Sequence, residues 1–399
     1  MQYAVQKAGS AVAYCALGIK VGTRDEEGFH SGIAHFTEHT IFKGTKTKSA
    51  SVINGYLDRL GGELNAYTTK EEIVLHATVL KEDFKKAGSL LLELASTSVF
   101  PEREIETERG VVIDEIQSYK DSPADDVYDR FEEKIFEGHA LSNPILGTVQ
   151  SVKKITSDEL RRFVAQKFVP GLMALTVVAP IDEEILSKEV LKMISRYFGQ
   201  TPSPVPERRL STPLINKFDI RTDKRNHEVN AVIGGLAPSL YEEKERYAAI
   251  LMSNILAGPA SNSILNSVVR EKNGWVYAVE TSYTQYSDCG ILAVCLGCDK
   301  SNLDKCLAAV QKEILRLQTI PLSDARLSAA KKQLLGQLAI SGDNGESQCL
   351  SMGKNLLSFG RISPKGEVRS KIEAITSQDI LDVTLRIFNP SGVSRLIFL

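Results

Sequence analysis

Two short stretches of this chain repeat each other at the ends of its two halves. Residues 155–160 read ITSDEL and residues 375–380 read ITSQDI, and a phenylalanine and a proline follow each at matching positions (Phe168 and Pro170, Phe388 and Pro390). Each copy opens with a threonine at a predicted helix N-cap and has an acidic residue three positions later, the pattern that satisfies the free N–H groups of a helix start. Both copies lead into a largely apolar, strand-like run, at 175–178 and 396–399. The chain is therefore predicted to contain a duplicated domain.

A proline-rich segment separates the two halves. Around residues 200–207 the hydrophobic periodicity is lost, and Pro202, Pro204 and Pro206 fall within five positions. Because proline fixes φ and removes a backbone donor, this segment is expected to be extended and exposed. We predict a first domain at 1–200, a linker at 201–213 and a second, homologous domain at 214–399. The 399 residues, 43% of them apolar, are enough for two hydrophobic cores.

Hydrophobic periodicity predicts strands and helices in a similar order in both halves. In the first half we expect strands near 12–21, 64–69 and 73–80, and helices near 32–43, 50–60, 81–97 and 101–119. In the second half we expect strands near 230–236, 277–286 and 289–298, and helices near 240–256, 261–270, 302–318 and 323–339. Strands and helices that are mostly segregated indicate the α+β class. Each domain is predicted to be a mostly antiparallel sheet with helices packed on one face.

Composition and charge limit the classes of partner. Lys and Arg total 48 and Asp and Glu total 50, so a chain without a basic stripe is not expected to bind nucleic acid. It has no apolar run long enough for a membrane span, and its first residues lack the apolar core of a secretory signal. Six sparse cysteines, including the C-x-x-C pair Cys295 and Cys298, are interpreted as reduced structural thiols of a cytoplasmic protein. The acidic runs at 121–129 and 132–133 are interpreted as solvated helix faces.

The strongest chemical signal is the segment His35-Phe36-Thr37-Glu38-His39. Histidines four residues apart project from one face of a helix, so that both imidazoles can reach one metal ion. Glu38 lies on that face too, where a carboxylate can act as general base toward a metal-activated water. This order of residues is the inverzincin signature. The alternative is three polar residues on a solvated helix, and the apolar residues on both sides of the segment argue against it.

Two histidines leave a catalytic zinc site one protein ligand short. The predicted helix at 101–119 offers several carboxylates, of which Glu108 and Glu115 lie seven residues, or two turns, apart. A helix that buries Val111, Val112 and Ile116 carries Glu115 partly inward. One of the two glutamates is expected to bind the metal and the other to orient a histidine through its free N–H. Spacing alone does not choose between them.

With these residues the chain resembles the pitrilysin and mitochondrial processing peptidase family of zinc metallopeptidases, in its short two-domain form. Residues 22–26, 32–39 and 42–45 (GTRDE, GIAHFTEH and FKGT) are similar to its first-domain signature, and residues 108–116 (ERGVVIDEI) are similar to the segment that carries its third metal ligand. The resemblance implies that His35, His39 and Glu115 bind one Zn²⁺ per chain. It also implies that Glu108 is a helper carboxylate of the active site.

The resemblance further implies two substrate-binding elements. Arg270 and Tyr277, in the segment REKNGWVY, are similar to the Arg and Tyr of the family's second domain, fixed donors that can hold a peptide carbonyl or its developing oxyanion. Judged by residue type alone, a purely structural role fits equally well, with Arg270 in a salt bridge and Tyr277 packed at the start of a strand. Asn65, Ala66 and Tyr67 resemble the family's edge strand, which pairs with an extended peptide whatever its side chains.

We therefore expect a zinc-dependent endopeptidase that hydrolyses peptides or unfolded segments through metal-activated water. Its expected partners are the peptide substrate and a second chain, in a homodimer or in a heterodimer with a related protein. The alternative is a non-catalytic subunit of a related peptidase assembly. Such subunits typically lose motif residues. In this chain all five first-domain motif residues (His35, Glu38, His39, Glu108 and Glu115) and both second-domain residues (Arg270 and Tyr277) are present, which favours the enzyme.

Overall fold

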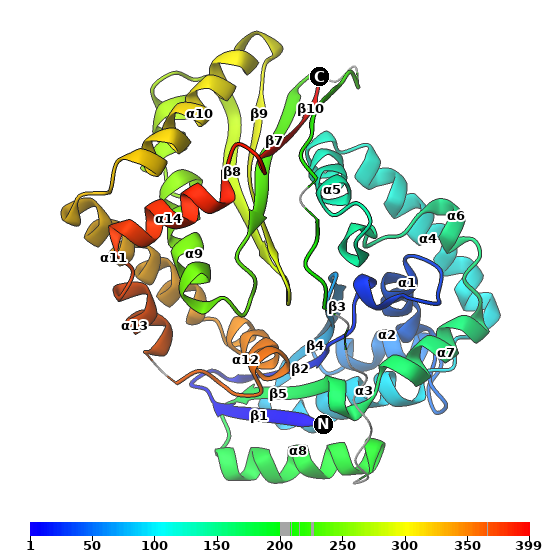
Figure 1. The fold of residues 1–399 in the computed structure, drawn as a ribbon. Coiled ribbons are helices and arrows are strands. Elements are labelled where there is room, and N and C mark those ends of the chain that lie inside the picture. Colours follow the sequence, from blue (N-terminus) through cyan, green and yellow to red (C-terminus); the bar gives the residue numbers. More distant parts are fainter. Residues whose placement is uncertain (200–207, 209, 215, 225–226, 365) are drawn as a thin grey trace. The chain divides into compact units, whose positions relative to one another are not determined.

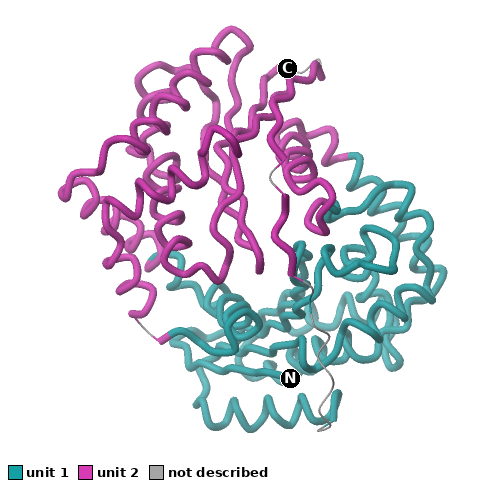
Figure 2. Tube along the Cα trace, viewed as in Figure 1, with its two compact units in different colours: residues 1–117, 143–209, 340–363 teal, residues 118–142, 210–339, 364–399 magenta. Residues whose placement is uncertain are grey.

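The computed structural model describes residues 1–199, 208, 210–214, 216–224, 227–364 and 366–399. The chain forms two compact units, each built from three separate segments (Figures 1 and 2). Unit 1 consists of residues 1–117, 143–209 and 340–363, and unit 2 consists of residues 118–142, 210–339 and 364–399. Most of the predicted linker at 201–213 lies outside the described residues.

Each unit contains one five-stranded sheet, and the two sheets have the same topology. In unit 1 the order is β1-β5-β2-β4-β3, with strands β1 (Gln2–Lys7), β2 (Val12–Ile19), β3 (Glu63–Thr68), β4 (Ile73–Leu80) and β5 (Met173–Ala179). In unit 2 the order is β6-β10-β7-β9-β8, with strands β6 (Asp219–Thr222), β7 (Val229–Ala237), β8 (Val276–Gln285), β9 (Gly290–Cys298) and β10 (Ser394–Phe398). In each sheet the first pair of neighbours is parallel and the other pairs are antiparallel.

The helices belong to the two units as follows. Unit 1 contains α1 (Ile33–Thr40), α2 (Ala50–Asp58), α3 (Phe84–Thr97), α6 (Val149–Val152), α7 (Ser157–Lys167), α8 (Glu183–Phe198), α12 (Gly345–Phe359) and most of α4 (Glu102–Lys120). Unit 2 contains α5 (Pro123–Ile135), α9 (Glu243–Ala257), α10 (Leu303–Thr319), α13 (Glu367–Glu373), α14 (Ser377–Ile387) and most of α11 (Asp324–Gly342). None of the helices in the described ranges combines the length and the apolar composition that a membrane span requires.

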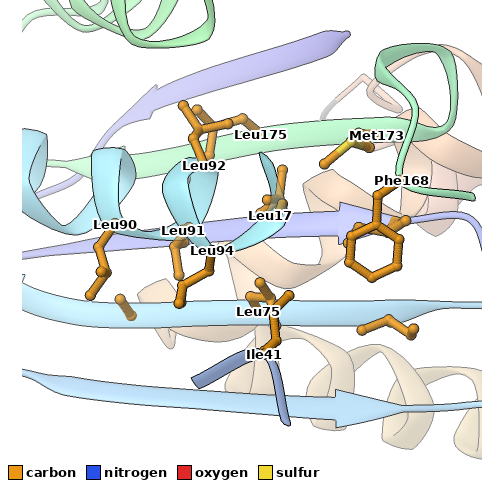
Figure 3. Close-up of a cluster of buried hydrophobic side chains, with 14 of the residues drawn as sticks. Leu17, Ile41, Leu75, Leu90, Leu91, Leu92, Leu94, Phe168, Met173 and Leu175 are labelled. Carbon is orange, nitrogen blue, oxygen red and sulfur yellow. The ribbon is translucent and has the colours of Figure 1, made fainter. Parts of the chain in front are cut away.

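The main core of unit 1 lies between one face of its sheet and the helices that pack on that face. Figure 3 shows Leu17, Leu75 and Leu175, from three neighbouring strands, beside leucines of α3. Successive strand residues point to opposite faces, so this core takes every second residue of each strand. The unit 2 core is built in the same way from β7, β9, α9, α10 and α14. The predicted class, α+β with two homologous domains of mostly antiparallel strands, is confirmed.

The repeated stretches form the same element in each unit. Helices α7 and α14 both begin after a threonine whose hydroxyl accepts the N–H of the residue three positions later, Thr156 from Glu159 and Thr376 from Asp379. Strands β5 and β10 follow them and pair with a neighbour on each side. The predicted N-caps and the strands that follow them are confirmed.

One helix on the opposite face of each sheet comes from the other half of the chain. Helix α12 packs on sheet 1, where Cys349 and Met352 meet Ala16, Val74 and Val178. Helix α5 packs on sheet 2, where Phe131 and its neighbours meet β7, β9 and β10. The compact units therefore do not follow the predicted division of the chain into 1–200 and 214–399. Apolar periodicity shows that a helix has a buried face, but it does not show which sheet that face meets.

Some local features were missed or were predicted wrongly. Strand β1 was not predicted, and it pairs in parallel with β5. Val111, expected to be buried, is 48% exposed, whereas Val112 and Ile116 are buried. The acidic run at 132–133 is not simply solvated: Glu132 is buried in α5 and accepts a hydrogen bond from the Tyr286 hydroxyl. That tyrosine lies in unit 2 but 154 residues away in the chain, beyond the reach of a local pattern.

Candidate metal centre

Helix α1 carries the His35–His39 segment and begins in a tightly specified way. Its N-cap, Gly32, has φ +88°, and a Cβ there would lie 2.8 Å from the Leu146 carbonyl oxygen, so only glycine fits. The buried Glu26 carboxylate accepts the backbone N–H groups of Gly32 and Ala34, each at 2.9 Å. These contacts satisfy N–H groups that a helix start otherwise leaves free. The first turn of the helix that carries the His35–His39 segment is therefore fixed by contacts within the protein.

Helix α4 supplies the carboxylates. Ile105, Val112 and Ile116 bury one stripe of this helix, and Glu108 is 7% exposed beside that stripe. Arg109 holds α4 in place, because its guanidinium donates to the carbonyl oxygens of Val152 and Ile155 and lies 5.6 Å from the ring centroid of Phe36 in α1. Glu115, two turns after Glu108, is carried toward the histidines.

His35, His39 and Glu115 form a cluster in which one ligand atom from each lies within 4.8 Å of the others. Oε2 of Glu115 lies 3.6 Å from Nε2 of His35 and 3.3 Å from Nε2 of His39. This oxygen is buried and has no hydrogen-bond partner of good geometry among the described residues. Two imidazole nitrogens and one carboxylate oxygen, all able to bind a metal, therefore converge.

The donor set fits zinc. Zinc takes histidine nitrogen and carboxylate oxygen at about 2.0–2.2 Å, and a tetrahedral arrangement at those lengths separates the ligand atoms by roughly 3.3–3.5 Å. The measured separations of 3.3 and 3.6 Å are of this size. Two histidines and one glutamate also match the protein ligands of some catalytic zinc sites, which leave the fourth position open.

A second layer of contacts surrounds His39. Its Nδ1 lies 2.9 Å from Oε1 of Glu108, and Oε2 of Glu108 lies 2.6 Å from Nζ of Lys43. Because an ionised carboxylate only accepts, Nδ1 of His39 carries a proton, and Nε2 is the nitrogen that can bind a metal once it is deprotonated. His35 differs, because its buried Nδ1 has no hydrogen-bond partner among the described residues.

The ionisation of the free site follows from these contacts. Burial, together with the neighbouring His39, lowers the pKa of His35 to about 4. Burial also opposes the charged form of His39, but the contacts with Glu108 and Glu115 outweigh it and raise the pKa of His39 to about 9. The contact with His39 holds the pKa of Glu115 below its usual range. A neutral His35 and an ionised Glu115 are therefore ready to bind a cation, whereas His39 must release a proton.

Glu38 lies beside the cluster without belonging to it. Its Oε2 accepts a hydrogen bond of 3.1 Å from the Thr68 hydroxyl, at the end of β3. Burial raises the pKa of Glu38, although His39 and Thr68 offset part of the effect. A carboxylate with a raised pKa is a stronger base than a solvated one, as a proton acceptor requires.

The predicted peptide-binding residues lie on β3, the edge strand of sheet 1 (Figure 1). Asn65, Ala66 and Tyr67 pair with His76, Leu75 and Val74 of β4 on one side, and on the other side β3 has no neighbouring strand among the described residues. The hydrogen bond from Thr68 to Glu38 ties this edge strand to α1. An unpaired edge is able to accept an extended peptide as an added strand.

Arg270 and Tyr277 both lie in unit 2. Arg270 is exposed in a π-helical turn (Asn266–Glu271), and such turns occur frequently at functional sites. Tyr277 is 57% exposed on β8 and donates a hydrogen bond of 2.8 Å to Oδ1 of Asp299. The tyrosine is therefore not packed as a core residue.

Lys43 and Thr68 contact the site but have no predicted role. A signal for Lys43 exists in the sequence, since it follows His39 by four residues and the chain stays helical through the 3₁₀ turn Ile41–Lys43. Thr68 has no comparable signal, because its partner Glu38 lies 30 residues away and their contact depends on how β3 packs beside α1.

Two family models match the chain in succession. Residues 3–149 match the insulinase model of peptidase family M16, and residues 154–334 match the M16 model described as the inactive domain. A "zinc protease" of Rickettsia bellii is 30% identical over 379 residues, which cover 95% of this chain and 90% of that protein. The chain belongs to peptidase family M16. The zinc protease YmxG of Bacillus subtilis is 28% identical and covers 96% of this chain, with 92% of its own length matched.

Solved structures share the fold of this M16 chain. A protease from Helicobacter pylori matches with a TM-score of 0.90 at 18% identity, covering 99% of this chain and 96% of that one. An M16 inactive-domain structure from Pseudomonas fluorescens matches with a TM-score of 0.87 at 17% identity, covering 99% and 94%. The predicted family resemblance is confirmed.

Proposed function

We propose that this M16 chain is a zinc-dependent endopeptidase in which His35, His39 and Glu115 bind one Zn²⁺ and Glu38 is the general base. The observation that supports it most is the convergence of these three ligand atoms beside a carboxylate that lies outside the set. The choice of zinc as the metal is consistent with the relatives that are named zinc proteases. When bound, zinc would lower the pKa of a water molecule and polarise a peptide carbonyl.

The chain's own residues have separate tasks in this proposal. Glu38 takes the proton of the attacking water and later delivers a proton to the leaving amine. Glu108 orients His39 through its Nδ1–H. Asn65, Ala66 and Tyr67 bind an extended peptide through the free edge of β3. The substrate is accordingly a peptide or an unfolded segment, since only an extended chain can lie along β3 as an added strand.

Arg270 and Tyr277 are proposed to hold the substrate carbonyl as fixed donors. Their exposure leaves their polar groups accessible to a ligand. The functional unit is further proposed to contain two chains, alike or related, in the cytoplasm. Six cysteines without a disulfide are consistent with that compartment.

The test is to measure zinc content and hydrolysis of quenched-fluorescent peptides for the wild type and for Glu38→Gln. We expect about one zinc per chain in both, and a rate about 100- to 10,000-fold lower in the variant, the usual contribution of a general base. Glu102→Gln, an exposed glutamate at the start of α4, is the control and should match the wild type.

Two results would contradict the proposal. Equal hydrolysis by Glu38→Gln would remove Glu38 from the chemistry. Zinc bound by all three proteins without hydrolysis by any would favour the alternative, a non-catalytic subunit, and light scattering of the chain alone and mixed with a related chain would then identify a partner.

A further inference from the structure

The Glu108 carboxylate is divided between two partners. Oε1 faces Nδ1 of His39 at 2.9 Å, and Oε2 faces Nζ of Lys43 at 2.6 Å. Glu108 is 7% exposed, so water does not replace either partner freely. The three side chains form a continuous polar chain from Lys43 to a proposed zinc ligand.

Each end of this chain constrains the carboxylate. A buried carboxylate with one partner is free to rotate about its last bond, or to leave one oxygen unsatisfied at a cost of about 1–3 kcal/mol or more. With Lys43 on Oε2, the carboxylate plane is fixed and Oε1 stays aimed at His39. The charge-assisted contacts with His39 and Lys43 also hold the pKa of Glu108 below its usual range, although burial works against them.

His39 depends on this arrangement more than His35 does. His35 is 5% exposed, and its Nδ1 has no hydrogen-bond partner in the part of the chain that the structure describes. The His39 side chain is 20% exposed, and Glu108 is the polar partner of its Nδ1. Of the two histidines, His39 is therefore the one whose orientation rests on a side-chain contact.

The backbone around Lys43 is fixed independently of the metal cluster. The Ser98 hydroxyl donates to the carbonyl of Ile41, and the Val99 N–H donates to the carbonyl of Gly44. These bonds tie the turn to the segment just before α4. Lys43 thus approaches Glu108 from a part of the backbone that does not depend on bound metal.

We propose that Lys43 is a positioning residue of the metal centre, which fixes the Glu108 carboxylate so that it orients His39 for metal binding. The inference rests on the proposed zinc site. Lys43 touches neither metal nor substrate, and it acts only through Glu108.

The chain offers a matched control five residues later. Lys48 contacts Glu93, another buried carboxylate, and its side chain is 21% exposed against 22% for Lys43. Glu93 also accepts hydrogen bonds from the hydroxyls of Thr45 and Thr47, and none of its side-chain contacts among the described residues is with a histidine. Replacing Lys48 therefore removes an equivalent ion pair without touching the path to His39.

The experiment measures the Kd for Zn²⁺ by chelator competition in the full chain for the wild type, Lys43→Met, Lys43→Arg and Lys48→Met. We expect Lys43→Met to bind zinc about 10- to 100-fold more weakly, the range for contacts behind a metal ligand. Lys43→Arg keeps the positive charge and should recover most of the affinity, and Lys48→Met should match the wild type. The visible spectrum of the Co²⁺-loaded protein should change for Lys43→Met and not for Lys48→Met.

Thermal unfolding of the four metal-free proteins shows whether a substitution lowers stability as well as zinc affinity. A positioning role predicts weaker zinc binding by Lys43→Met without a larger loss of stability than in Lys48→Met. Unchanged zinc affinity in Lys43→Met would overturn the inference, as would equal weakening by Lys43→Met and Lys48→Met. Should Lys43→Met fail to fold, Lys43→Gln replaces it under the same criteria. A wild type that binds no zinc would instead overturn the proposed metal site itself, so the two failures are distinguishable.

Discussion

The two units present the same sheet topology with different chemistry on matching helices. Glu115 is the fourteenth residue of α4 (Glu102–Lys120), and Gln337 is the fourteenth residue of α11 (Asp324–Gly342), a helix of the same length. In unit 1, Glu115 faces His35 and His39. In unit 2, Oε1 of Gln337 accepts a hydrogen bond of 2.7 Å from Nδ2 of Asn254, in α9.

This difference shows how one scaffold can bring together a set of potential metal ligands or lack it. An amide pair satisfies itself, because one amide donates and the other accepts. A carboxylate oxygen that faces two imidazole nitrogens needs a positive charge beside it, which is the protonated His39 in the free site and would be a metal ion once that proton is released. The fold thus supplies positions, and a few side chains at those positions decide the chemistry.

The largest expected effect comes from cutting the chain at the predicted linker. A fragment of residues 1–200 lacks α12, whose Met352, Leu356 and Leu357 are buried against sheet 1. At about 1.5–3 kcal/mol for each large apolar side chain, their loss removes up to about 5–9 kcal/mol, close to the whole stability of a typical domain. We expect the fragment not to unfold cooperatively in a urea titration followed by circular dichroism.

Addition of a peptide of residues 340–363 to this fragment is the matching control. It should restore a cooperative transition if the exchanged helix is what the fragment lacks. A fragment 1–200 that unfolds cooperatively at the wild-type midpoint would instead show that α12 is dispensable for unit 1.

The second prediction converts the unit 1 site toward that of unit 2. Glu115→Gln replaces the carboxylate by the amide found at the matching position, and an amide oxygen is a much weaker zinc ligand than a carboxylate. We expect zinc affinity to fall by more than the roughly 100-fold typical of contacts behind a ligand, and hydrolysis to fall with it. Chelator competition and the peptide assay measure both effects.

The reverse change, Gln337→Glu, tests the other side of the comparison. A carboxylate opposite Asn254 has no imidazole beside it in the described contacts, so the zinc content should stay at that of the wild type. A second zinc per chain would show that unit 2 needs only one charge to become a metal site.

The sequence predicted which residues of the candidate metal cluster lie together better than it predicted which segments build each unit. The placement of His35, Glu38 and His39 on one helical face follows from local spacing, and so does the two-turn separation of Glu108 and Glu115. Two features were missed because each depends on contacts far apart in the chain. One is the exchange of α5 and α12, and the other is the burial of Glu132 beside Tyr286.

The third prediction compares Glu26, whose carboxylate accepts N–H groups at the start of α1, with Glu242, which lies at the N-cap position of α9. Glu26 is buried and forms no ion pair with a positively charged side chain among the described residues, and burial raises its pKa to about 8. Glu242 is also partly buried, but Arg386 and the Ser239 N–H hold its pKa below the usual range. The contributions of the two glutamates to stability therefore depend on pH in opposite directions.

The sign follows from proton linkage. The folded pKa of Glu26 lies above the unfolded one, so its contribution is fully present below about pH 4.5 and is lost as the pH rises toward about 8, with a slope of at most ~1.4 kcal/mol per pH unit. The folded pKa of Glu242 is depressed, so its contribution is present above the unfolded pKa and is lost as the pH falls through the folded value.

Hydrogen exchange, corrected for its intrinsic pH dependence, should show α1 losing protection between about pH 5 and 8 while α9 does not. Equal trends in both helices would contradict this, and in Glu26→Gln the trend in α1 should flatten.

The smallest expected effect concerns Tyr277, whose hydroxyl donates to Asp299 in unit 2. This hydrogen bond raises the pKa of Tyr277, since phenolate beside a carboxylate is disfavoured. Asp299→Ala should lower that pKa and free the hydroxyl to donate elsewhere, so we expect a modestly lower KM for peptides with little change in kcat.

The phenolate difference spectrum of Asp299→Ala minus that of Asp299→Ala with Tyr277→Phe isolates this tyrosine from the other eleven. Asp299→Asn keeps an acceptor oxygen without the charge, and it should lie between the wild type and Asp299→Ala. An unchanged KM alongside a lowered pKa would mean that the Tyr277 proton takes no part in binding substrate, which would leave Arg270 as the donor that unit 2 contributes.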